Sequence, residues 1–276
     1  MGEILPWEEK ALEELNDVPE LREERLKQFA EKLAELQSDD FRPLLQRDFL
    51  MMFLRTRKFD VARALKSYVA AFSMHKADPT VFWPKGKGPA DYRLVLELPI
   101  CKVMPKKNSD GTTVIVCTYL RYTSDLFSIL DVITVSTMIC AHLLRDPYIQ
   151  TYGVTCVFDY RNLQVKHLRS IPIKYYKAVA IAVRDGCPAR LRGFHHVFAP
   201  TFMSLMFYAL RPLLNRKLSS RTHFHSKVAD LHQLVCTEAL PDELGGTAGK
   251  MAPGAFEEDL LASHDEYVRS SYYGFS

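Results

Sequence analysis

The segment Gly153-Val-Thr-Cys-Val-Phe-Asp-Tyr160 has the character of a buried β-strand, because β-branched and aromatic residues run through it with no charge before Asp159. A second stretch of the same kind, Thr113-Val-Ile-Val-Cys-Thr-Tyr119, follows the turn signal Asp110-Gly111. Further strands are predicted over residues 191–198 and 221–225. The sequence therefore predicts a sheet built from short, buried strands.

Helical patterns alternate with these strands. We expect helices over residues 129–145, 171–184, 202–217 and 227–235, and Ser170 is placed to cap the second of them. Strand, helix and strand in succession predict a mainly parallel sheet flanked by helices. The fold class is therefore α/β.

The first part of the chain has no strand pattern. Apolar residues at helical spacing predict helices over residues 21–36, 48–56 and 61–75, which suggest a small N-terminal bundle. Proline and glycine are concentrated over residues 78–90. We expect an acidic helical extension over residues 1–40, a helical domain over 41–78, a linker over 79–90, an α/β domain over 91–250 and a C-terminal tail over 251–276.

Composition excludes several classes of protein. With 276 residues, 47% hydrophobic and 25% charged, the chain is neither collagen-like nor disordered. The most apolar region, residues 197–214, is interrupted by Pro200, Arg211 and Pro212, so no segment is expected to span a bilayer. Six scattered cysteines without a CxxC pair, and the absence of a signal-peptide pattern, predict a cytoplasmic protein.

Charge is strongly segregated along the chain. Residues 1–40 hold 13 acidic and 5 basic residues, a local charge of −8, so that a net charge of +3 leaves +11 for the remainder. Much of the excess lies in residues 184–227, and it comprises Arg184, Arg190, Arg192, Arg211, Arg216, Lys217, Arg221 and Lys227. A basic run of this kind is either a solvated face or an anion site. Leucines interleave with these charges, which disfavours nucleic acid as a partner and favours phospholipid head groups. The asymmetry also raises the hypothesis that the acidic segment folds back onto the basic face.

The predicted helix over residues 202–217 is apolar on more than one side, with Phe202, Leu205, Met206 and Leu213 in one stripe. It must then be buried on more than one side, either as a core helix or as a lid between an apolar cavity and a membrane. Cations follow it immediately along the chain. An apolar surface beside cations suits an anionic membrane interface and favours the lid.

No catalytic motif is present. The sequence has no GxSxG and no HExxH, and Lys250 of its glycine-rich stretch is followed by Met251 where a phosphate loop needs Ser or Thr. His223 and His225 lie two residues apart on one strand and would share a face, but no third ligand is evident. We therefore expect neither an enzyme nor a metal site.

Several motifs resemble, in order, the landmarks of the CRAL-TRIO family of lipid-binding proteins. They are Phe53-Leu-Arg-Thr-Arg-Lys-Phe-Asp60, Gly153-Val-Thr-Cys-Val-Phe-Asp159, Arg190-Leu-Arg-Gly-Phe-His195, Ala199-Pro200, Arg211-Pro-Leu-Leu214 and Leu240-Pro-Asp-Glu-Leu-Gly-Gly246. Each motif alone is weak. Together they are specific, and they extend over 199 positions from Asp48 to Gly246.

The resemblance implies that the sheet floors a hydrophobic pocket closed by a mobile gate helix, here from Pro200 to about Leu214. By matching positions, the pocket is lined by Ser136, Cys140, Val154, Phe158, Leu163, Ile171, Val179, Val183, Leu191, Phe194, Met203, Met206, Leu210 and Leu214. Ser136 can orient a ligand hydroxyl. The resemblance implies a bound hydrophobic lipid, tocopherol-like, retinoid or related, and no other cofactor.

In the tocopherol-binding branch of the family, a basic cluster beside the gate binds phosphatidylinositol bisphosphate. Its counterparts here are Arg57, Arg190, Arg192, Lys217 and Arg221. The resemblance thus implies transfer of a lipid between membranes, with docking and release triggered by phosphoinositides at endosomal or other intracellular membranes. The alternative is a trafficking adaptor that binds phosphoinositides and transfers no cargo.

Overall fold

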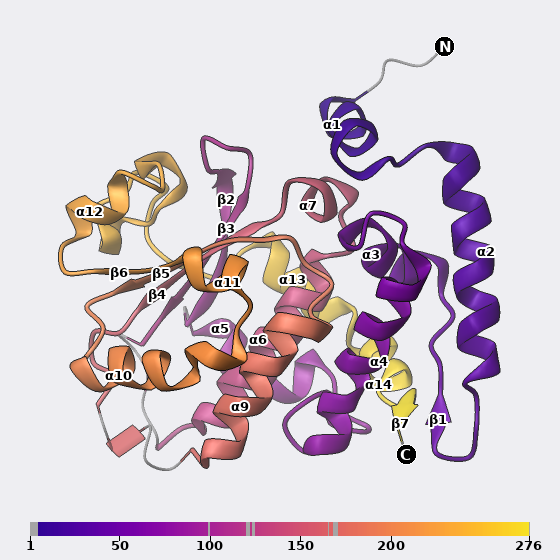
Figure 1. Ribbon diagram of the computed structural model, residues 1–276. Coiled ribbons are helices and arrows are strands. Elements are labelled where there is room, and N and C mark those ends of the chain that lie inside the picture. Colours follow the sequence, from indigo (N-terminus) through magenta and orange to yellow (C-terminus); the bar gives the residue numbers. More distant parts are fainter. Residues whose placement is uncertain are drawn as a thin grey trace.

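A five-stranded sheet forms the centre of the molecule (Figure 1). The structure is a computed structural model, and it describes residues 5–98, 100–119, 122, 125–164, 166–167 and 171–275. The strands are β2 (Cys101–Lys107), β3 (Thr113–Thr118), β4 (Val154–Asp159), β5 (Leu191–Val197) and β6 (Thr222–His225), and they lie side by side in that order. Only the β2–β3 pair is antiparallel among these described strands. The predicted α/β fold with a mainly parallel sheet is confirmed.

One glycine fixes the junction between β4 and β5. Gly153 has φ +95°, a conformation that other residues rarely adopt, and a Cβ there would lie 2.1 Å from the carbonyl oxygen of Arg190. The next residue, Val154, donates its N–H to that same carbonyl at 3.0 Å. The start of β4 therefore holds Arg190 at the start of β5.

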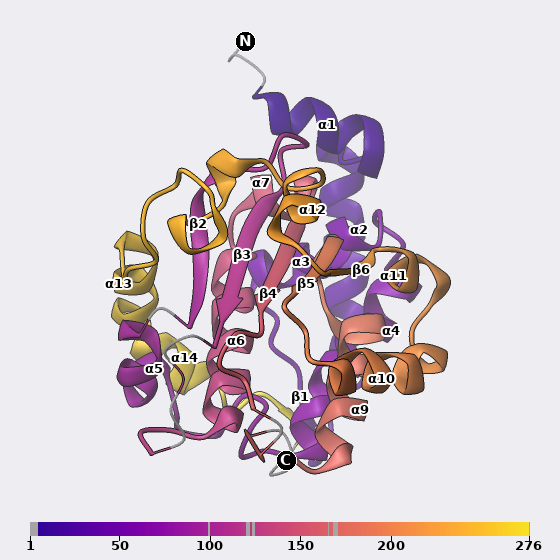
Figure 2. The ribbon, with the colours of Figure 1, turned by 90° about the vertical axis from the view of Figure 1, so that its left-hand side faces the viewer.

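Different elements cover the two faces of the sheet (Figure 2). On one face lie α6 (Ile129–Leu143), α9 (Ile173–Ile181) and α10 (Thr201–Leu210). On the other lie α12 (Val228–His232) and the short 3-10 turns Thr237–Ala239 and Asp242–Leu244. A π-turn, Ala182–Gly186, continues α9 toward β5.

The predicted N-terminal helices are confirmed as α2 (Pro19–Glu35), α3 (Arg47–Thr56) and α4 (Val61–Ala77). They pack around Tyr68, whose ring centroid lies 5.1 Å from that of Phe53 and 5.9 Å from that of Phe29. The Tyr68 hydroxyl is bonded to both the backbone N–H and the carbonyl of Leu44. A shorter helix, α1 (Pro6–Leu15), precedes them and packs on α7 (Pro147–Tyr152).

Residues 251–275 are not extended away from the molecule. They form α13 (Ala255–Ala262), α14 (His264–Ser270) and β7 (Gly274–Phe275), and β7 pairs with β1 (Phe41–Arg42) near the other end of the chain. Leu260 and Tyr267 belong to the same buried cluster as α6. The segment after the helical bundle contributes the 3-10 turn Pro89–Tyr92 and α5 (Arg93–Glu97) to this side of the molecule. The predicted domain boundaries stay predictions.

The helix predicted over residues 202–217 is wrong in its extent. The chain forms α10 and a 3-10 turn, Arg211–Leu213, and then starts a new helix, α11 (Arg216–Ser220). Pro212 explains the break, because its ring is incompatible with the preceding helical turn and it has no N–H to donate. The side chain of Asn215 then caps α11 by accepting the N–H of Leu218. Ser170, the predicted cap of the preceding helix, lies outside the described residues.

None of the helices in the described part of the chain combines the length and the apolar character needed to cross a bilayer.

Candidate functional site

The two faces of the sheet are packed to different degrees. On one face, Val116, Val157 and Val197 have no exposed surface beneath the apolar residues of α12 and the turns after it. On the other face, Cys156 and Phe158 remain only half-buried, although β4 lies in the middle of the sheet. A strand covered by helices normally loses its solvent access. The side of the sheet that faces α6, α9 and α10 is therefore incompletely filled.

Three cysteines indicate where the unfilled space lies. Cys140 on α6, Cys156 on β4 and Cys187 after the π-turn each keep some accessible surface. Burial nevertheless raises the pKa of all three thiols. A thiol open to bulk water would keep its ordinary pKa, since water stabilises the thiolate. Accessible surface combined with desolvation is what thiols bordering an enclosed space would show, and we call the space among these three side chains the hollow.

A few polar groups lie on the same side of the sheet. The hydroxyl of Tyr160 lies 2.8 Å from Nδ1 of His196, and the His196 ring stacks on Phe158 with centroids 5.2 Å apart. Burial lowers the pKa of His196 to about 4, so the imidazole is neutral at pH 7. The hydroxyl of Ser136 donates to the carbonyl of Val132 at 2.7 Å. The hollow thus combines apolar walls with a few neutral polar groups, as sites for small apolar ligands do.

The predicted pocket residues fall into two groups. Val154, Leu163 and Ile171 are closed off, with 3%, 5% and 7% of their surface exposed. The others keep accessible surface on the elements around the hollow: Ser136 and Cys140 on α6, Phe158 on β4, Val179 on α9, Val183 in the π-turn, Leu191 and Phe194 on β5, and Met203, Met206, Leu210 and Leu214 on or just after α10. Their contact with a ligand stays a prediction.

The list of predicted pocket residues lacks four residues on this side of the sheet or beside it: Cys156, Tyr160, Cys187 and His196. The signal for three of them was available. Cys156 lies between Val154 and Phe158 on one strand and His196 lies two residues after Phe194, so the two-residue period of a strand places each on the face already predicted. Tyr160 lies two residues after Phe158 in the predicted strand, so the same period places it there as well, whereas Cys187 follows the π-turn, where no periodic signal applies.

The core-helix interpretation of α10 is wrong. Its sequence, Thr201-Phe-Met-Ser-Leu-Met-Phe-Tyr-Ala-Leu210, carries no charge, yet none of its residues is buried, and Leu205 and Tyr208 are 63% and 61% exposed. Its contact with the sheet includes the Phe207 ring, whose centroid lies 5.3 Å from that of Phe224 on β6. An apolar helix with one side on the sheet edge and the other in solvent has the geometry of a lid.

Regular backbone geometry is interrupted on both sides of α10. Phe198, shortly before it, has φ +55°, which is unusual for a residue other than glycine. Pro212 ends the helical segment on the other side, and Arg184 of the π-turn donates to the carbonyl of Leu213 there at 2.9 Å. The apolar segment is therefore a discrete unit between two breaks.

Four of the five predicted phosphoinositide-binding residues come together. The pKa of Lys217 is lowered first by burial and then by the charges of Arg221, Arg192, Arg190 and Lys58. We call Lys58, Arg190, Arg192, Lys217 and Arg221 the basic cluster. Like charges raise each other's energy unless an anion lies among them, so the cluster is a favourable place for one.

Arg57 lies apart from the basic cluster. Its guanidinium donates to the hydroxyl of Ser67 at 2.8 Å and to the carbonyl of Asp185 at 3.0 Å, so it joins α4 to the π-turn. The neighbouring Lys58 has φ +55°, which turns the chain between the two side chains. The predicted role of Arg57 in the anion site stays a prediction, and Lys58, which the sequence prediction did not include, is the adjacent cation whose charge acts on Lys217.

The acidic N-terminal segment contacts the basic cluster. The carboxylate of Glu14 on α1 accepts from Arg190 in a very short contact and from Arg192 at 3.4 Å. The other N–H groups of these arginines donate to the backbone carbonyls of Thr151 and Tyr152. The hydrogen bond from Arg190 is the largest of the effects that lower the pKa of Glu14 to about 2. The predicted fold-back of the acidic segment is thus present at this contact.

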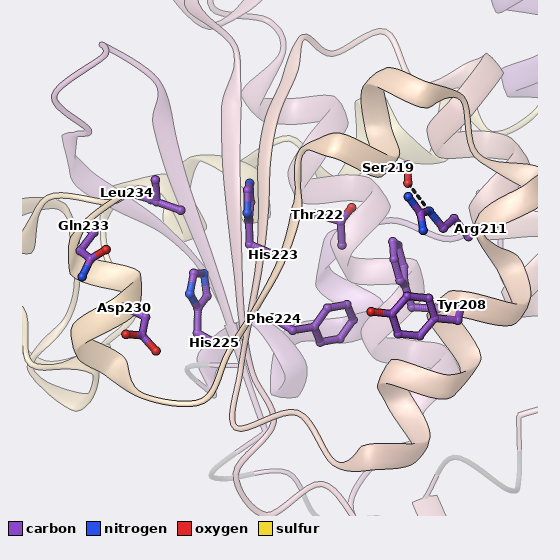
Figure 3. Close-up of a pocket in the computed structure, with 11 residues that line it drawn as sticks. Tyr208, Arg211, Ser219, Thr222, His223, Phe224, His225, Asp230, Gln233 and Leu234 are labelled. Carbon is purple, nitrogen blue, oxygen red and sulfur yellow. Dashed lines mark hydrogen bonds between the residues drawn. The ribbon is translucent and has the colours of Figure 1, made fainter.

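A groove of about 600 Å³ opens at the edge of the sheet, along β6 (Figure 3). In the close-up, His225 lies on the α12 side of the groove near Asp230, while Phe224 points to the α10 side, toward Tyr208. Its lining, Phe207, Tyr208, Arg211, Ser219, Thr222, His223, Phe224, His225, Asp230, Gln233 and Leu234, includes none of the predicted pocket residues. The groove is therefore distinct from the hollow that the thiols border.

His195 is a third imidazole beside His223 and His225, and the sequence analysis did not connect it with them. Its Nδ1 lies 3.0 Å from Nε2 of His225, and its ring centroid lies 5.2 Å from that of His223. Among the described residues, no group of three or more His, Cys, Asp and Glu side chains is arranged to hold a metal ion. Stacking and one hydrogen bond account for the trio.

Comparison with known proteins places the chain in a family. The family model of the CRAL/TRIO domain matches residues 99–246, which is more than half of the chain. The chain belongs to the CRAL/TRIO family. The predicted membership is confirmed, and the matched region runs from the start of β2 through α10 to the last 3-10 turn on the far face of the sheet.

Curated relatives share about a quarter of their residues with this CRAL/TRIO chain. It is 28% identical over 261 residues to human alpha-tocopherol transfer protein-like, covering 94% of this chain and 75% of that protein. It is 25% identical over 276 residues to mouse clavesin-1, covering 96% of this chain and 76% of that protein. The solved structure described as the crystal structure of Sfh5 covers 95% of this chain and 98% of its own with a TM-score of 0.50 and 12% identity, a similarity in fold.

Proposed function

We propose that this protein binds a small hydrophobic lipid in the hollow between the sheet and α10. The observation that carries the proposal is the contrast around β4: desolvated but accessible side chains on a central strand, beneath an uncharged helix with no buried residue. Membership of the CRAL/TRIO family and similarity to a protein named for tocopherol transfer support it. A tocopherol-like or retinoid ligand is the class we propose.

A closed pocket would solve a physical problem of lipid transport. Each methylene exposed to water costs about 0.8 kcal/mol, so a lipid with a long tail leaves a membrane as a free monomer very slowly. A protein that shields the tail during transit removes most of this cost. No covalent step and no further cofactor are needed for such a carrier.

We further propose that the protein acts at the surface of intracellular membranes that contain phosphoinositides. Leu205 and Tyr208 project from the outer side of α10. The basic cluster lies on α11, at the starts of β5 and β6 and, through Lys58, between α3 and α4. Apolar side chains beside cations suit an anionic interface. Opening of α10 at the membrane would then release the ligand while a head group occupies the basic cluster.

Transfer of a fluorescent tocopherol or retinoid between vesicles tests this proposal. Cys156→Phe would fill the hollow, whereas Cys236→Phe places the same change at a half-buried cysteine that packs against the other cluster. We expect the first variant to lose transfer and the second to retain it, with folding of both checked by circular dichroism. Equal transfer by both variants contradicts a ligand in the hollow.

The same assay separates a carrier from a phosphoinositide-binding adaptor. A carrier accelerates transfer, and acceptor vesicles containing phosphatidylinositol bisphosphate accelerate it further. An adaptor binds such vesicles without moving any of the probes. Vesicle binding without transfer would therefore replace the carrier proposal by the adaptor.

A further inference from the structure

Helix α1 is attached to the domain by a small apolar contact and by charge. Ala11 and Leu15 are each 1% exposed against their surroundings, and the ammonium group of Lys10 lies 4.7 Å from the centroid of the Tyr152 ring on α7. Over its 10 residues, α1 has only these two buried side chains. Together with the Trp7 ring, which lies beside the guanidinium of Arg55, these contacts hold the helix through few buried side chains.

The charged contact of α1 falls on the residues proposed to bind a membrane anion. Glu14 accepts from both Arg190 and Arg192, 176 and 178 positions along the chain, and Lys10 lies 3.1 Å from the same carboxylate. A carboxylate held by two guanidinium groups makes the same kind of charge-assisted bonds as a phosphate. Glu14 thus stands where an anionic group would be bound.

The rest of the basic cluster is not neutralised by α1. Among the described residues, no acidic side chain pairs with Lys58, Lys217 or Arg221 within 4.0 Å, although Arg221 donates to the carbonyl of Leu191. One carboxylate therefore faces five cations. A phosphorylated head group, with up to two negative charges and three acceptor oxygens per phosphate, would balance the cluster better.

The chain after α1 has the features of a pivot. Asn16 adopts the left-handed conformation with φ 60° and ends the helix. The next residue, Asp17, has a fully buried side chain that accepts from Arg55 at 2.8 Å and from Arg22 at 2.7 Å. Movement of α1 about Asn16 would leave this anchor in place.

We propose that α1 is a displaceable arm whose Glu14 occupies part of the basic cluster and competes with phosphorylated lipid head groups for Arg190 and Arg192. This inference rests on the proposed binding of anionic membranes. In the free protein the arm is closed, and its carboxylate screens the cluster. A phosphoinositide head group displaces Glu14, so that the full cluster becomes available only at a membrane that carries such lipids.

Matched point variants test the arm without removing its apolar contacts. Glu14→Gln removes the competing charge in nearly the same shape, and Glu13→Gln makes the same charge change at the neighbouring exposed position. Binding is measured to phosphatidylcholine vesicles with and without phosphatidylinositol bisphosphate. We expect Glu14→Gln to bind the phosphoinositide vesicles about fivefold or more tightly than the wild type, in the range of ordinary coupling between sites, and Glu13→Gln to match the wild type.

The outcomes separate the arm from the proposed function. Equal binding by the wild type and both variants overturns the arm while leaving membrane binding intact. Absence of binding by all three proteins overturns the proposed function and the arm with it. Tighter binding by Glu14→Gln and Glu13→Gln alike shows a general effect of net charge and also overturns the arm.

A fluorescence measurement reports the movement of α1 itself. The chain has 2 tryptophans, and Trp7 lies on α1 with its ring 5.6 Å from the guanidinium of Arg55. In a Trp83→Phe background, titration with soluble inositol trisphosphate should shift Trp7 emission to the red as the ring becomes exposed. A head group that binds, as measured by calorimetry, without any change in Trp7 emission contradicts displacement.

Discussion

Helices α6 and α10 are both apolar and face the same side of the sheet, yet they are packed in opposite ways. Eight residues of α6 are buried, and it belongs to the main hydrophobic cluster. None of α10 is buried, and neither hydrophobic cluster of the described residues includes a residue of it. The neighbours of a helix, more than its own composition, decide whether it is part of the core.

The difference has a consequence for function. A helix locked into the core by side chains on every side cannot move without unfolding its neighbours. A helix held by a few ring contacts at a sheet edge, with backbone breaks at Phe198 and Pro212, can move at little cost. The comparison predicts that α6 carries stability and α10 carries ligand exchange and membrane contact.

The largest expected effect comes from truncating one side chain in each helix. Ile139→Ala on α6, where the side chain is 1% exposed, should lower the free energy of unfolding by about 2–5 kcal/mol. Leu205→Ala on α10, where it is 63% exposed, should lower it by less than about 0.5 kcal/mol. Urea denaturation measures both. A similar loss in the two variants would show that α10 is a core helix after all.

A charge on the outer side of α10 should impair membrane binding without unfolding the protein. Burial of a leucine in an apolar phase is worth about 1.5–3 kcal/mol, so Leu205→Asp should weaken binding to phosphoinositide vesicles by roughly 10- to 150-fold. Leu94→Asp is the control, because Leu94 on α5 is 44% exposed and lies on an element away from α10. Sedimentation with vesicles compares them, and equal binding by both variants would remove α10 from the interface.

Charge reversal next to α10 should produce a smaller effect that depends on salt. Each basic residue near an anionic surface contributes about 1 kcal/mol, so Lys217→Glu should weaken vesicle binding by roughly 10- to 30-fold at low ionic strength and much less near 1 M salt. Arg57→Gln should leave vesicle binding nearly unchanged, since that guanidinium is bonded to Ser67 and Asp185. A larger loss in Arg57→Gln than in Lys217→Glu would reverse our assignment.

Acid should lower the free energy of unfolding through two histidines, one on each face of the sheet, that are neutral in the folded protein. Burial lowers the pKa of His196, on the open face, to about 4, and that of His195, on the packed face, to about 3, from a usual 6.5. The unfolded chain binds these protons first as the pH falls. The free energy of unfolding should therefore decrease from pH 6.5 toward pH 4, by at most about 1.4 kcal/mol per pH unit for each group.

Denaturation at a series of pH values measures this effect. His196→Gln should remove the contribution of His196 to the pH dependence of the free energy of unfolding. The contribution of His195 should remain. If the wild type and the variant show the same pH dependence, His196 does not titrate as its burial requires.

Four of the five strands of the central sheet were predictable because short apolar runs between turn signals have few alternatives. Strand β2, Cys101-Lys-Val-Met-Pro-Lys-Lys107, was missed because its lysines and Pro105 break the apolar pattern. β3, β4, β5 and β6 each begin and end within one residue of the predicted segments. Pro212 indicated that the helix would end near α10's last residue. The sequence analysis extended the helix past it because the apolar pattern continues to Leu214. Helix α7 and strands β1 and β7 are too short for a periodic signal, and their positions depend on contacts between distant parts of the chain.

The site was predictable only in part. The resemblance indicated which side of the sheet and which cations to consider, and the structure places four of those cations together. Lys58 was not among those predicted cations, because the left-handed backbone at Lys58 and Phe59 has no signal in the sequence. The pairing of Glu14 with Arg190 and Arg192 joins residues more than 170 positions apart, and charge balance gave only its direction.

Native mass spectrometry of the purified protein, combined with lipid extraction, tests the hollow most directly. After exposure to tocopherol- or retinoid-loaded vesicles, the wild type should carry one lipid per chain, and Cys156→Phe should carry none while remaining folded. A wild-type chain that takes up no lipid from any of these vesicles, or a Cys156→Phe variant loaded as fully as the wild type, would contradict the account.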